Sequence, residues 1–515
     1  MRVLALKPGH DGAIAYVDDG RLVFSLEGEK DSFPRYAPVT ERTITRALEL
    51  APGFPDVIAT GGWHKPLPGL RAEIGAGYYG LRPGTVREGR LFGEPVTMFT
   101  STHERSHILT AVSMAPGAPL RDCAVLVWEG RIGAFYLWRD HGADIIPVKV
   151  LDRPGARYAA LFALADEGYP DHGTEFDPAF AGKLMALAAY ATEDLDPRER
   201  GAVEELLRIE VPPFNKGAFR GSRLYNAGVH TPVTHAAARY LTDRIFAIYH
   251  EAAVRELPRG LPLVISGGCG LNCEWNRRWR ESGLFSDVFV PPCANDSGSA
   301  IGTAMDAAVF FGDPCRLEWD VYAGDAFHHD VEPSAERWRT RRLVHGEVAR
   351  ALAAGAVVAW VRGRYEIGPR ALGHRSLLAA PFDARSRDVL NRIKGREDYR
   401  PVGPCCRHEE LHEWFDDAIE DPYMLYVSPV RTSALPAVTH VDGSARVQSV
   451  RAAQEPALHR LLTEFRRTTG YGVLCNTSLN FQGRGFVNTM SELVAYCELR
   501  GIDEIVVDDV RYSRR

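Results

Sequence analysis

The densest concentration of chemically active side chains in this sequence is a basic stretch in its last third. The motifs EIGPRALGHRS and NRIKGREDYRPVGP, together with a residue two positions before the first, include these six cations: Arg364, Arg370, Arg375, Lys394, Arg396 and Arg400. Guanidinium groups bind phosphate oxygens through paired hydrogen bonds, and a lysine adds a compact charge. A solvated basic face is the alternative, but such a face does not need rigid Gly and Pro turns around its charges. The stretch therefore predicts a preformed phosphate site.

Neutral hydrogen-bonding groups follow an apolar stretch near the C-terminus. The segment VLCNTSLN supplies Asn476, Thr477, Ser478 and Asn480. Directly after a strand, these side chains are well placed to bind a carbonyl or an amide. The same residue types also form turns, so the local sequence leaves both interpretations open.

Two histidines and one aspartate are candidate metal ligands. His103 and His107 stand four residues apart in HERSH, which places both imidazoles on one face of a helix. Two histidines alone do not define a site, and surface histidines are the alternative. Asp296, in PPCANDSGSAIG, is the oxygen ligand best suited to join them. An aspartate also suits the N-cap of the helix that SGSAIG can begin, so both roles stay open.

A glycine-rich turn in ISGGCGLNCEWN follows an apolar strand. Gly267 and Gly268 would let backbone amides approach a phosphate or a ribose closely, although two glycines after a strand are a weak signal. Cys269 and Cys273 lack a second Cys or His pair nearby, which favours packing over zinc binding.

The elements around these residues alternate between strands and helices. The sequence opens with strand, turn and strand, in VLAL, KPGHDG and AIAYV, and a third strand and the helix ERTITRALEL follow. A similar pattern begins again at DCAVLVWEG, which predicts two related halves. Residues 155–255 are predicted to be helical, and DEIVVDDVRY is predicted as a strand near the end.

Length and composition bound the class of protein. The 515 residues, 45% hydrophobic and 25% charged, are enough for two domains. We predict domains at 1–335, with a helical insertion at about 155–255, and at 340–515. The net charge of −6 is not that of a nucleic-acid-binding protein. We expect no signal peptide, no membrane span, nine reduced cysteines and a cytoplasmic location.

Taken in order, the motifs resemble the O-carbamoyltransferase family of antibiotic and nodulation pathways over practically the whole chain. They are GHDGAIA, HGTEFDPAFAGKLMALAAY, SGGCGLNCEWN, PPCANDSGSAIG, EIGPRALGHRS, NRIKGREDYRPVGP, VTHVDGSARVQSV and NTSLNFQGRGFVN. The opening, through SLEGEKDSFPRYAP, looks most like the members that modify a 3-hydroxymethylcephem.

That resemblance implies an α/β fold with an N-terminal domain of the actin-like ATPase and sugar-kinase type and a C-terminal YrdC-like domain. It also implies two reactions. ATP and carbamoyl phosphate form carbamoyl adenylate in the C-terminal domain with Mg²⁺. The carbamoyl group then passes, at a site with Fe(II) or Zn²⁺, to a hydroxyl of a small molecule.

The resemblance also assigns roles by position. His10 is implied as the general base, Arg370 and Lys394 as catalytic residues, and His103, His107 and Asp296 as metal ligands. The family usually has an aspartate where VLVWEGRIG has Glu129, so Glu129 is the expected fourth ligand. The implied substrate- and nucleotide-binding residues are Lys183, Gly267, Gly268, Asn272, Asn295, Gly298, Arg364, Arg375, Arg396, Arg400, Asn476, Ser478 and Asn480.

Two other functions fit parts of the sequence. Carbamoyl or threonylcarbamoyl transfer to a macromolecule would use the same domain types. However, the negative net charge does not suit tRNA binding, and the sequence has no paired C-x-x-C zinc module. A non-catalytic nucleotide-binding protein would have no use for a second phosphate site. We expect a homodimer, which is the commonest assembly.

Overall fold

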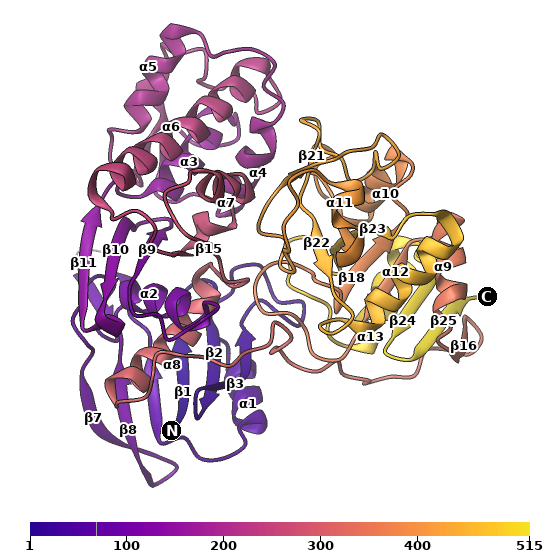
Figure 1. The fold of residues 1–515 in the computed structure, drawn as a ribbon, viewed down its shortest axis with the longest axis horizontal. Coiled ribbons are helices and arrows are strands. Elements are labelled where there is room, and N and C mark those ends of the chain that lie inside the picture. The colour runs from indigo at the N-terminus through magenta and orange to yellow at the C-terminus, as the bar shows by residue number, and fades with distance from the viewer. Residues whose placement is uncertain (68–69) are drawn as a thin grey trace. The chain divides into compact units, whose positions relative to one another are not determined.

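The computed structural model of the chain describes residues 1–67 and 70–515 (Figure 1). These residues form two compact units. The first unit comprises Met1–Leu120, Pro291–Thr439 and Ser444–Arg515, and the second comprises Arg121–Val290 and His440–Gly443. The predicted domain bounds, 1–335 and 340–515, divide the chain differently from these two compact units, and they stay a prediction.

The first unit begins with a six-stranded sheet in the order β3-β2-β1-β4-β8-β7. Strand β1 pairs antiparallel with β2 and parallel with β4, as the predicted opening hairpin requires. The strands are β1 (Arg2–Lys7), β2 (Ala13–Asp18), β3 (Arg21–Glu27), β4 (Val57–Thr60), β7 (Val86–Leu91) and β8 (Glu94–Thr100). The predicted helix is α1 (Glu41–Leu50), and a separate ribbon pairs β5 (Trp63–Leu67) with β6 (Leu70–Ile74).

Two helices pack together on this sheet. Helix α2 (His103–Met114) begins after Thr102, whose side chain accepts a hydrogen bond from Arg105 N. Helix α8 (Ser299–Phe310) contacts α2, β1 and β2. A Cβ atom at Gly302 would lie 1.8 Å from the carbonyl oxygen of Ser106, so only glycine permits this close approach of the two helices.

A buried ion pair joins the same two helices. Arg105 of α2 is 7% exposed and Asp306 of α8 is fully buried. The Nε atom of Arg105 donates to Asp306 Oδ2 at 3.0 Å, and Ser101 Oγ donates to the same oxygen at 2.5 Å. The pair therefore holds α2, the helix that carries both histidines of HERSH, against α8.

We expect Asp306→Ala to lower the free energy of unfolding by about 3–5 kcal/mol, because the substitution leaves the Arg105 guanidinium buried without its counter-ion. Urea denaturation of the purified variant measures the change. Asp313→Ala, at a carboxylate with a 39% exposed side chain, is the control and should stay within about 0.5 kcal/mol of the wild type. Equal stability of the two variants would show that the buried pair does not hold α2.

The second unit contains a sheet with the same connectivity as the first. Its order is β11-β10-β9-β14-β15, in which β9 pairs antiparallel with β10 and parallel with β14. The strands are β9 (Cys123–Trp128), β10 (Gly133–Arg139), β11 (Asp144–Lys149), β14 (Leu263–Ser266) and β15 (Val288–Phe289). The repeated order confirms the two related halves that the sequence predicts.

Helices occupy the predicted interval between β11 and β14. They are α3 (Pro154–Ala165), α4 (Ala179–Ala188), α5 (Pro197–Leu206) and α6 (Pro232–Glu256), and they gather into one helical layer (Figure 1). The unit also contains β12 (His172–Gly173), β13 (Phe214–Asn215) and α7 (Cys273–Glu281). The helical insertion is thus part of the second compact unit.

The C-terminal part of the first unit is built on an eight-stranded mixed sheet, in the order β16-β25-β24-β17-β18-β23-β19-β22. Its strands are β16 (Trp338–Arg342), β17 (Val358–Val361), β18 (Arg375–Ala379), β19 (Gly403–Arg407), β22 (Gln448–Val450), β23 (Val473–Ser478), β24 (Glu504–Val507) and β25 (Val510–Arg514). The helices are α9 (His345–Ala353), α10 (Ala384–Lys394), α11 (Leu411–Trp414), α12 (Pro456–Thr469) and α13 (Met490–Arg500). Strands β20 (Ser428–Pro429) and β21 (Ser444–Ala445) form a short ribbon.

The prediction of a single strand in DEIVVDDVRY was wrong. The chain turns back at Asp508, whose φ of 49° is left-handed, and β24 and β25 pair as an antiparallel hairpin. Aspartate tolerates this conformation better than most residues, which suits it to tight turns. The mixed α/β fold class is confirmed, and no helix among the described residues is long and apolar enough to cross a membrane.

Candidate active site

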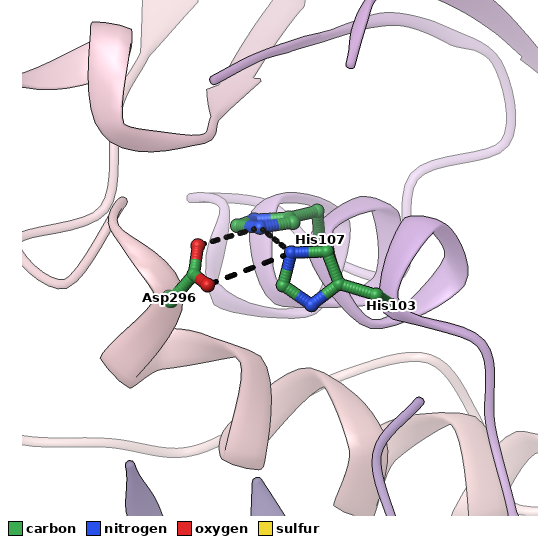
Figure 2. Close-up of side chains that lie close together, drawn as sticks. All are labelled: His103, His107 and Asp296. Carbon is green, nitrogen blue, oxygen red and sulfur yellow. Dashed lines mark hydrogen bonds and ion pairs between the residues drawn. The ribbon is translucent and has the colours of Figure 1, made fainter. Parts of the chain in front are cut away.

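The three predicted metal ligands of the first unit lie together (Figure 2). His103 and His107 project from the first turns of α2 toward Asp296, which begins the 3₁₀ turn Asp296–Gly298 before α8. The two Nε2 atoms are 3.1 Å apart, and each faces one oxygen of the carboxylate, at 3.3 Å from His107 and 3.6 Å from His103. All three side chains are buried.

These distances fit a metal ion. Ligand atoms at about 2.0–2.1 Å from a tetrahedral ion lie about 3.3 Å from one another, close to the three observed separations. Burial lowers the pKa of His103 well below its ordinary value, so its imidazole is neutral, the form that binds a metal. Two imidazoles and a carboxylate suit Fe(II) and Zn²⁺ alike.

The structure also bears on the two roles left open for Asp296. Its carboxylate points at the histidines, and helix α8 has Gly298 at its N-cap and no side-chain cap. Burial opposes the ionisation of Asp296, yet the Lys7 ammonium group and the neighbouring imidazole groups outweigh it and lower its pKa well below the ordinary range. Asp296 is therefore an ionised ligand candidate rather than a cap.

Lys7 belongs to this site and was missed by the sequence analysis. It ends β1, its side chain is fully buried, and its Nζ lies 2.9 Å from Asp296 Oδ2. The same Nζ donates to the carbonyl oxygen of His10 and lies 4.1 Å from the centre of the Trp63 ring. A lysine at the last position of a buried strand was the signal available in the sequence.

His10, the predicted general base, lies at the edge of the cluster. Its side chain is half exposed, and its Nδ1 is 3.4 Å from Asp11 Oδ2 and 3.7 Å from Asp296 Oδ2. Burial of the ring opposes protonation, but the Asp296 charge and the hydrogen bond with Asp11 raise the pKa of His10 above its ordinary value. An imidazole in this position can reach solvent and an incoming hydroxyl group.

Glu129, the predicted fourth ligand, lies in the second unit, directly after β9. It is buried, and its Oε1 accepts a hydrogen bond from the backbone amide of Ile132 at 2.7 Å. Metal binding by Glu129 stays a prediction.

A second candidate site surrounds Lys394, at the end of α10. Its buried Nζ donates to Ser478 Oγ at 2.8 Å and to Asn480 Oδ1, so three of the predicted residues meet. The pKa of Lys394 lies well below its ordinary value, first because of burial and then because of four neighbouring cations, namely Arg396, Arg35, Arg400 and Arg500. This excess of positive charge suits a phosphate ligand.

The other predicted residues of the phosphate site differ in what they contact. Arg364 donates to the carbonyl oxygens of Val23, Ala323 and Gly324, and the fully buried Arg375 donates to Asn488 Oδ1 and to three backbone carbonyls. Both guanidinium groups thus hold the fold together. Their predicted phosphate contacts remain untested.

Arg396 and Arg400 lie nearer to the phosphate site. Burial, followed by the charge of Arg400, lowers the pKa of Arg396 to about 9, and Arg396 Nε donates to Asn391 Oδ1 at 2.5 Å. Arg370 is partly buried in the loop after β17. Asn476 donates to Ala371 O and Gln448 Oε1, which leaves its buried Oδ1 without a partner among the described residues.

The remaining predicted residues divide between the units. Gly267 and Gly268 follow β14, and Asn272 caps α7 by accepting from Glu274 N and Trp275 N. Lys183 lies on α4, with its Nζ 5.7 Å from the centre of the Phe162 ring. Asn295 and Gly298 flank Asp296 in the first unit. The structure therefore places Asn295 and Gly298 beside the metal-ligand candidates.

Two family models match the chain. Residues 87–305 match the Carbamoyltransferase N-terminus and residues 349–514 match the Carbamoyltransferase C-terminus. The chain belongs to the carbamoyltransferase family, and the predicted enzyme class, a carbamoyltransferase, is confirmed.

Curated relatives match over the whole chain. The chain is 53% identical to a 3'-hydroxymethylcephem-O-carbamoyltransferase of Amycolatopsis lactamdurans and equally to one of Streptomyces clavuligerus, covering 100% of this chain and 99% of each relative. It is 34% identical to Nodulation protein U of Rhizobium tropici, covering 100% of this chain and 96% of that protein.

Solved structures resemble the chain only in part. A structure of full-length HypF in the phosphate- and nucleotide-bound form is 12% identical, with a TM-score of 0.32 over 60% of this chain and 56% of that one. The archaeal actin homolog Ta0583 with ADP is 14% identical, with a TM-score of 0.29 over 60% of this chain and 100% of that one. Such scores are too low to carry a functional argument.

Proposed function

We propose that this carbamoyltransferase uses ATP and carbamoyl phosphate to carbamoylate a hydroxyl group of a small molecule, and that the acceptor is the hydroxyl of a 3-hydroxymethylcephem. The observation that carries the proposal is the full-length identity of 53% to two proteins with that printed activity. The two clusters in the structure suit the two chemical steps of such a reaction.

The first step is assigned to the cluster around Lys394. Carbamoyl phosphate and ATP give carbamoyl adenylate, phosphate and pyrophosphate, a balance that consumes one water molecule. Lys394, Arg396 and Arg400 bind and orient the phosphate oxygens, and adenylation gives the carbamoyl group a leaving group that the enzyme can hold. Mg²⁺ would reduce the negative charge of the nucleotide.

The second step is assigned to His10 and the residues beside it. The acceptor oxygen attacks the carbonyl carbon of the adenylate, AMP leaves, and His10 takes the hydroxyl proton. His103, His107 and Asp296 would hold Fe(II) or Zn²⁺, which supplies Lewis acidity when bound. Lys7 keeps the Asp296 carboxylate ionised and in place. Carbamoyl transfer to a small acceptor needs no macromolecular partner.

We also propose a cytoplasmic location and a homodimer. The nine cysteines are all free, and two of them, Cys405 and Cys406, are adjacent and buried, which fits a reducing compartment that also supplies ATP. Twofold dimers are the commonest assembly of soluble enzymes.

The half-reaction tests the proposed function without an acceptor. Purified protein is incubated with ATP, Mg²⁺ and carbamoyl phosphate, and pyrophosphate and carbamoyl adenylate are followed by mass spectrometry. We expect pyrophosphate only when carbamoyl phosphate is present. Absence of pyrophosphate from folded, metal-loaded protein, also after addition of the cephem, would reject the proposal.

The role of His10 makes a separate prediction. His10→Asn should lower carbamoyl transfer by about a hundredfold or more, because general-base catalysis contributes about 10²–10⁴-fold. Pyrophosphate release should stay near the wild-type rate, since Lys394 lies in the other cluster. Assays of both steps on one preparation make the comparison, and an equal loss of both would refute the assignment of the base.

A further inference from the structure

A loop from the N-terminal sheet reaches the phosphate site of the C-terminal sheet. Residues 29–36, which follow β3, lie antiparallel to residues 483–486 within the first unit. Arg35 N donates to Gly483 O at 2.9 Å, and Ser32 N donates to Phe486 O at 3.0 Å. A Cβ atom at Gly485 would lie 2.0 Å from the Glu29 carbonyl oxygen, so the two backbones are in close contact.

The C-terminal partner of this loop also contacts Lys394. Asn480 accepts a hydrogen bond from Lys394 Nζ through its Oδ1, and its Nδ2 donates to the Arg484 carbonyl oxygen at 2.9 Å. The Arg484 side chain in turn donates to Ser32 O at 2.8 Å. A short series of contacts therefore runs from Lys394 through Asn480 to the loop that carries Arg35.

The Arg35 side chain is held but still accessible. Its Nε lies 3.0 Å from Glu29 Oε2, and 30% of the side chain is exposed. The same Glu29 oxygen accepts from Tyr36 N at 3.1 Å, which fixes the carboxylate in turn. An arginine whose Nε atom is paired with a carboxylate can still bind a ligand through its two terminal nitrogen atoms.

Electrostatics agree with this position. Arg35 is one of the four cations whose charge lowers the pKa of Lys394, and it is the only one of the four that the N-terminal part of the chain supplies. Arg35 is paired with Glu29, but the other three arginine charges and the ammonium group of Lys394 repel one another. A phosphate group would relieve that repulsion.

We propose that Arg35 is a phosphate-binding residue of the site around Lys394, so that this site is completed by the loop that follows β3. The ligand class is the phosphate chain of a nucleotide or its pyrophosphate product. The inference deepens the proposed function and rests on it for the identity of the reaction. It predicts that both parts of the first unit are needed for the first step.

Binding of inorganic pyrophosphate to the full-length chain tests the proposal without any turnover. We expect Arg35→Gln to weaken pyrophosphate binding by about tenfold or more, because charge-assisted hydrogen bonds contribute about 1.5–3 kcal/mol. Isothermal titration calorimetry at several salt concentrations makes the measurement. The salt dependence should become shallower in the variant, since one cation has been removed.

Arg42→Gln is the matched control. Arg42 is near in sequence, is half exposed and pairs with Asp31 at 3.6 Å, so its substitution should leave pyrophosphate affinity unchanged. Arg35→Lys retains the positive charge, so it serves as a second variant if Arg35→Gln does not fold. It should still bind pyrophosphate more weakly than the wild type, because the guanidinium group and its paired hydrogen bonds are lost. Wild-type affinity in either folded Arg35 variant, or weaker binding with an unchanged salt dependence, would overturn the proposal. Failure of the wild type to release pyrophosphate from ATP would instead count against the proposed function.

Discussion

Replacing Lys394 by alanine should lower the rate of pyrophosphate release by at least about a hundredfold, since the loss of one preorganised donor to a developing charge costs about 10²–10³-fold. Its ammonium group is buried against Ser478 and Asn480, and four neighbouring arginine charges act on it. Such a group is suited to bind an anion. Pyrophosphate release at saturating ATP and carbamoyl phosphate measures the effect.

The control for this variant lies on the same helix. Arg392 of α10 is exposed two residues before Lys394, and Arg392→Ala should keep wild-type activity. Lys394→Ala should also fold, because removal of a buried charge offsets the loss of its hydrogen bonds to Ser478 and Asn480. Normal turnover by the Lys394 variant would remove this cluster from the mechanism.

The second large effect is expected at the metal-ligand candidates. His103→Ala should lose the bound metal and lower carbamoyl transfer by at least about a hundredfold, since even the residues that hydrogen-bond to metal ligands contribute about 10–100-fold in affinity or activity. Pyrophosphate release should continue, because Lys394 lies in a separate cluster. Metal content by inductively coupled plasma mass spectrometry and the two half-reaction rates measure the result.

A histidine away from the cluster provides the comparison. His172 is exposed in the second unit, and His172→Ala should retain both the metal and the transfer step. A His103 variant that keeps its metal, or loses both half-reactions equally, would contradict the assignment. Asp296→Ala is less informative, because it would leave Lys7 buried without its counter-ion and destabilise the fold.

The sequence predicted the metal-ligand candidates only in part. The four-residue spacing of His103 and His107 was sufficient to place both on one helix face, as α2 confirms. Asp296 follows 189 positions after His107 in the numbering of the chain, so no local pattern could decide between a cap and a ligand. Lys7 was missed because its ion pair depends on packing between β1 and the turn before α8.

The phosphate site shows the same limit. The concentration of cations between residues 364 and 400 was visible in the sequence, and Lys394 does meet Ser478 and Asn480. Composition could not separate Lys394 from Arg375, whose guanidinium group donates to backbone carbonyls. Nor could it reveal Arg35, because only the fold brings residues 29–36 beside residues 483–486.

The fold was easier to predict where periodicity is strong. Apolar patterns in the sequence predict the opening hairpin, the similar strand pair β9 and β10, and the helices α3 to α6. The hairpin of β24 and β25 was missed because the two aspartates of its turn, Asp508 and Asp509, can also be polar residues within one continuous strand. Its detection depends on the left-handed backbone of Asp508.

The central claim is tested most directly by incubating the protein with ATP, Mg²⁺, carbamoyl phosphate and a 3-hydroxymethylcephem, and examining the cephem by mass spectrometry. We expect a carbamate ester, in which a CONH₂ group replaces the hydroxyl hydrogen, and its formation should require both ATP and carbamoyl phosphate. A cephem that remains unmodified while pyrophosphate is released would contradict the proposed acceptor. Carbamoylation that proceeds without ATP would contradict the adenylate mechanism.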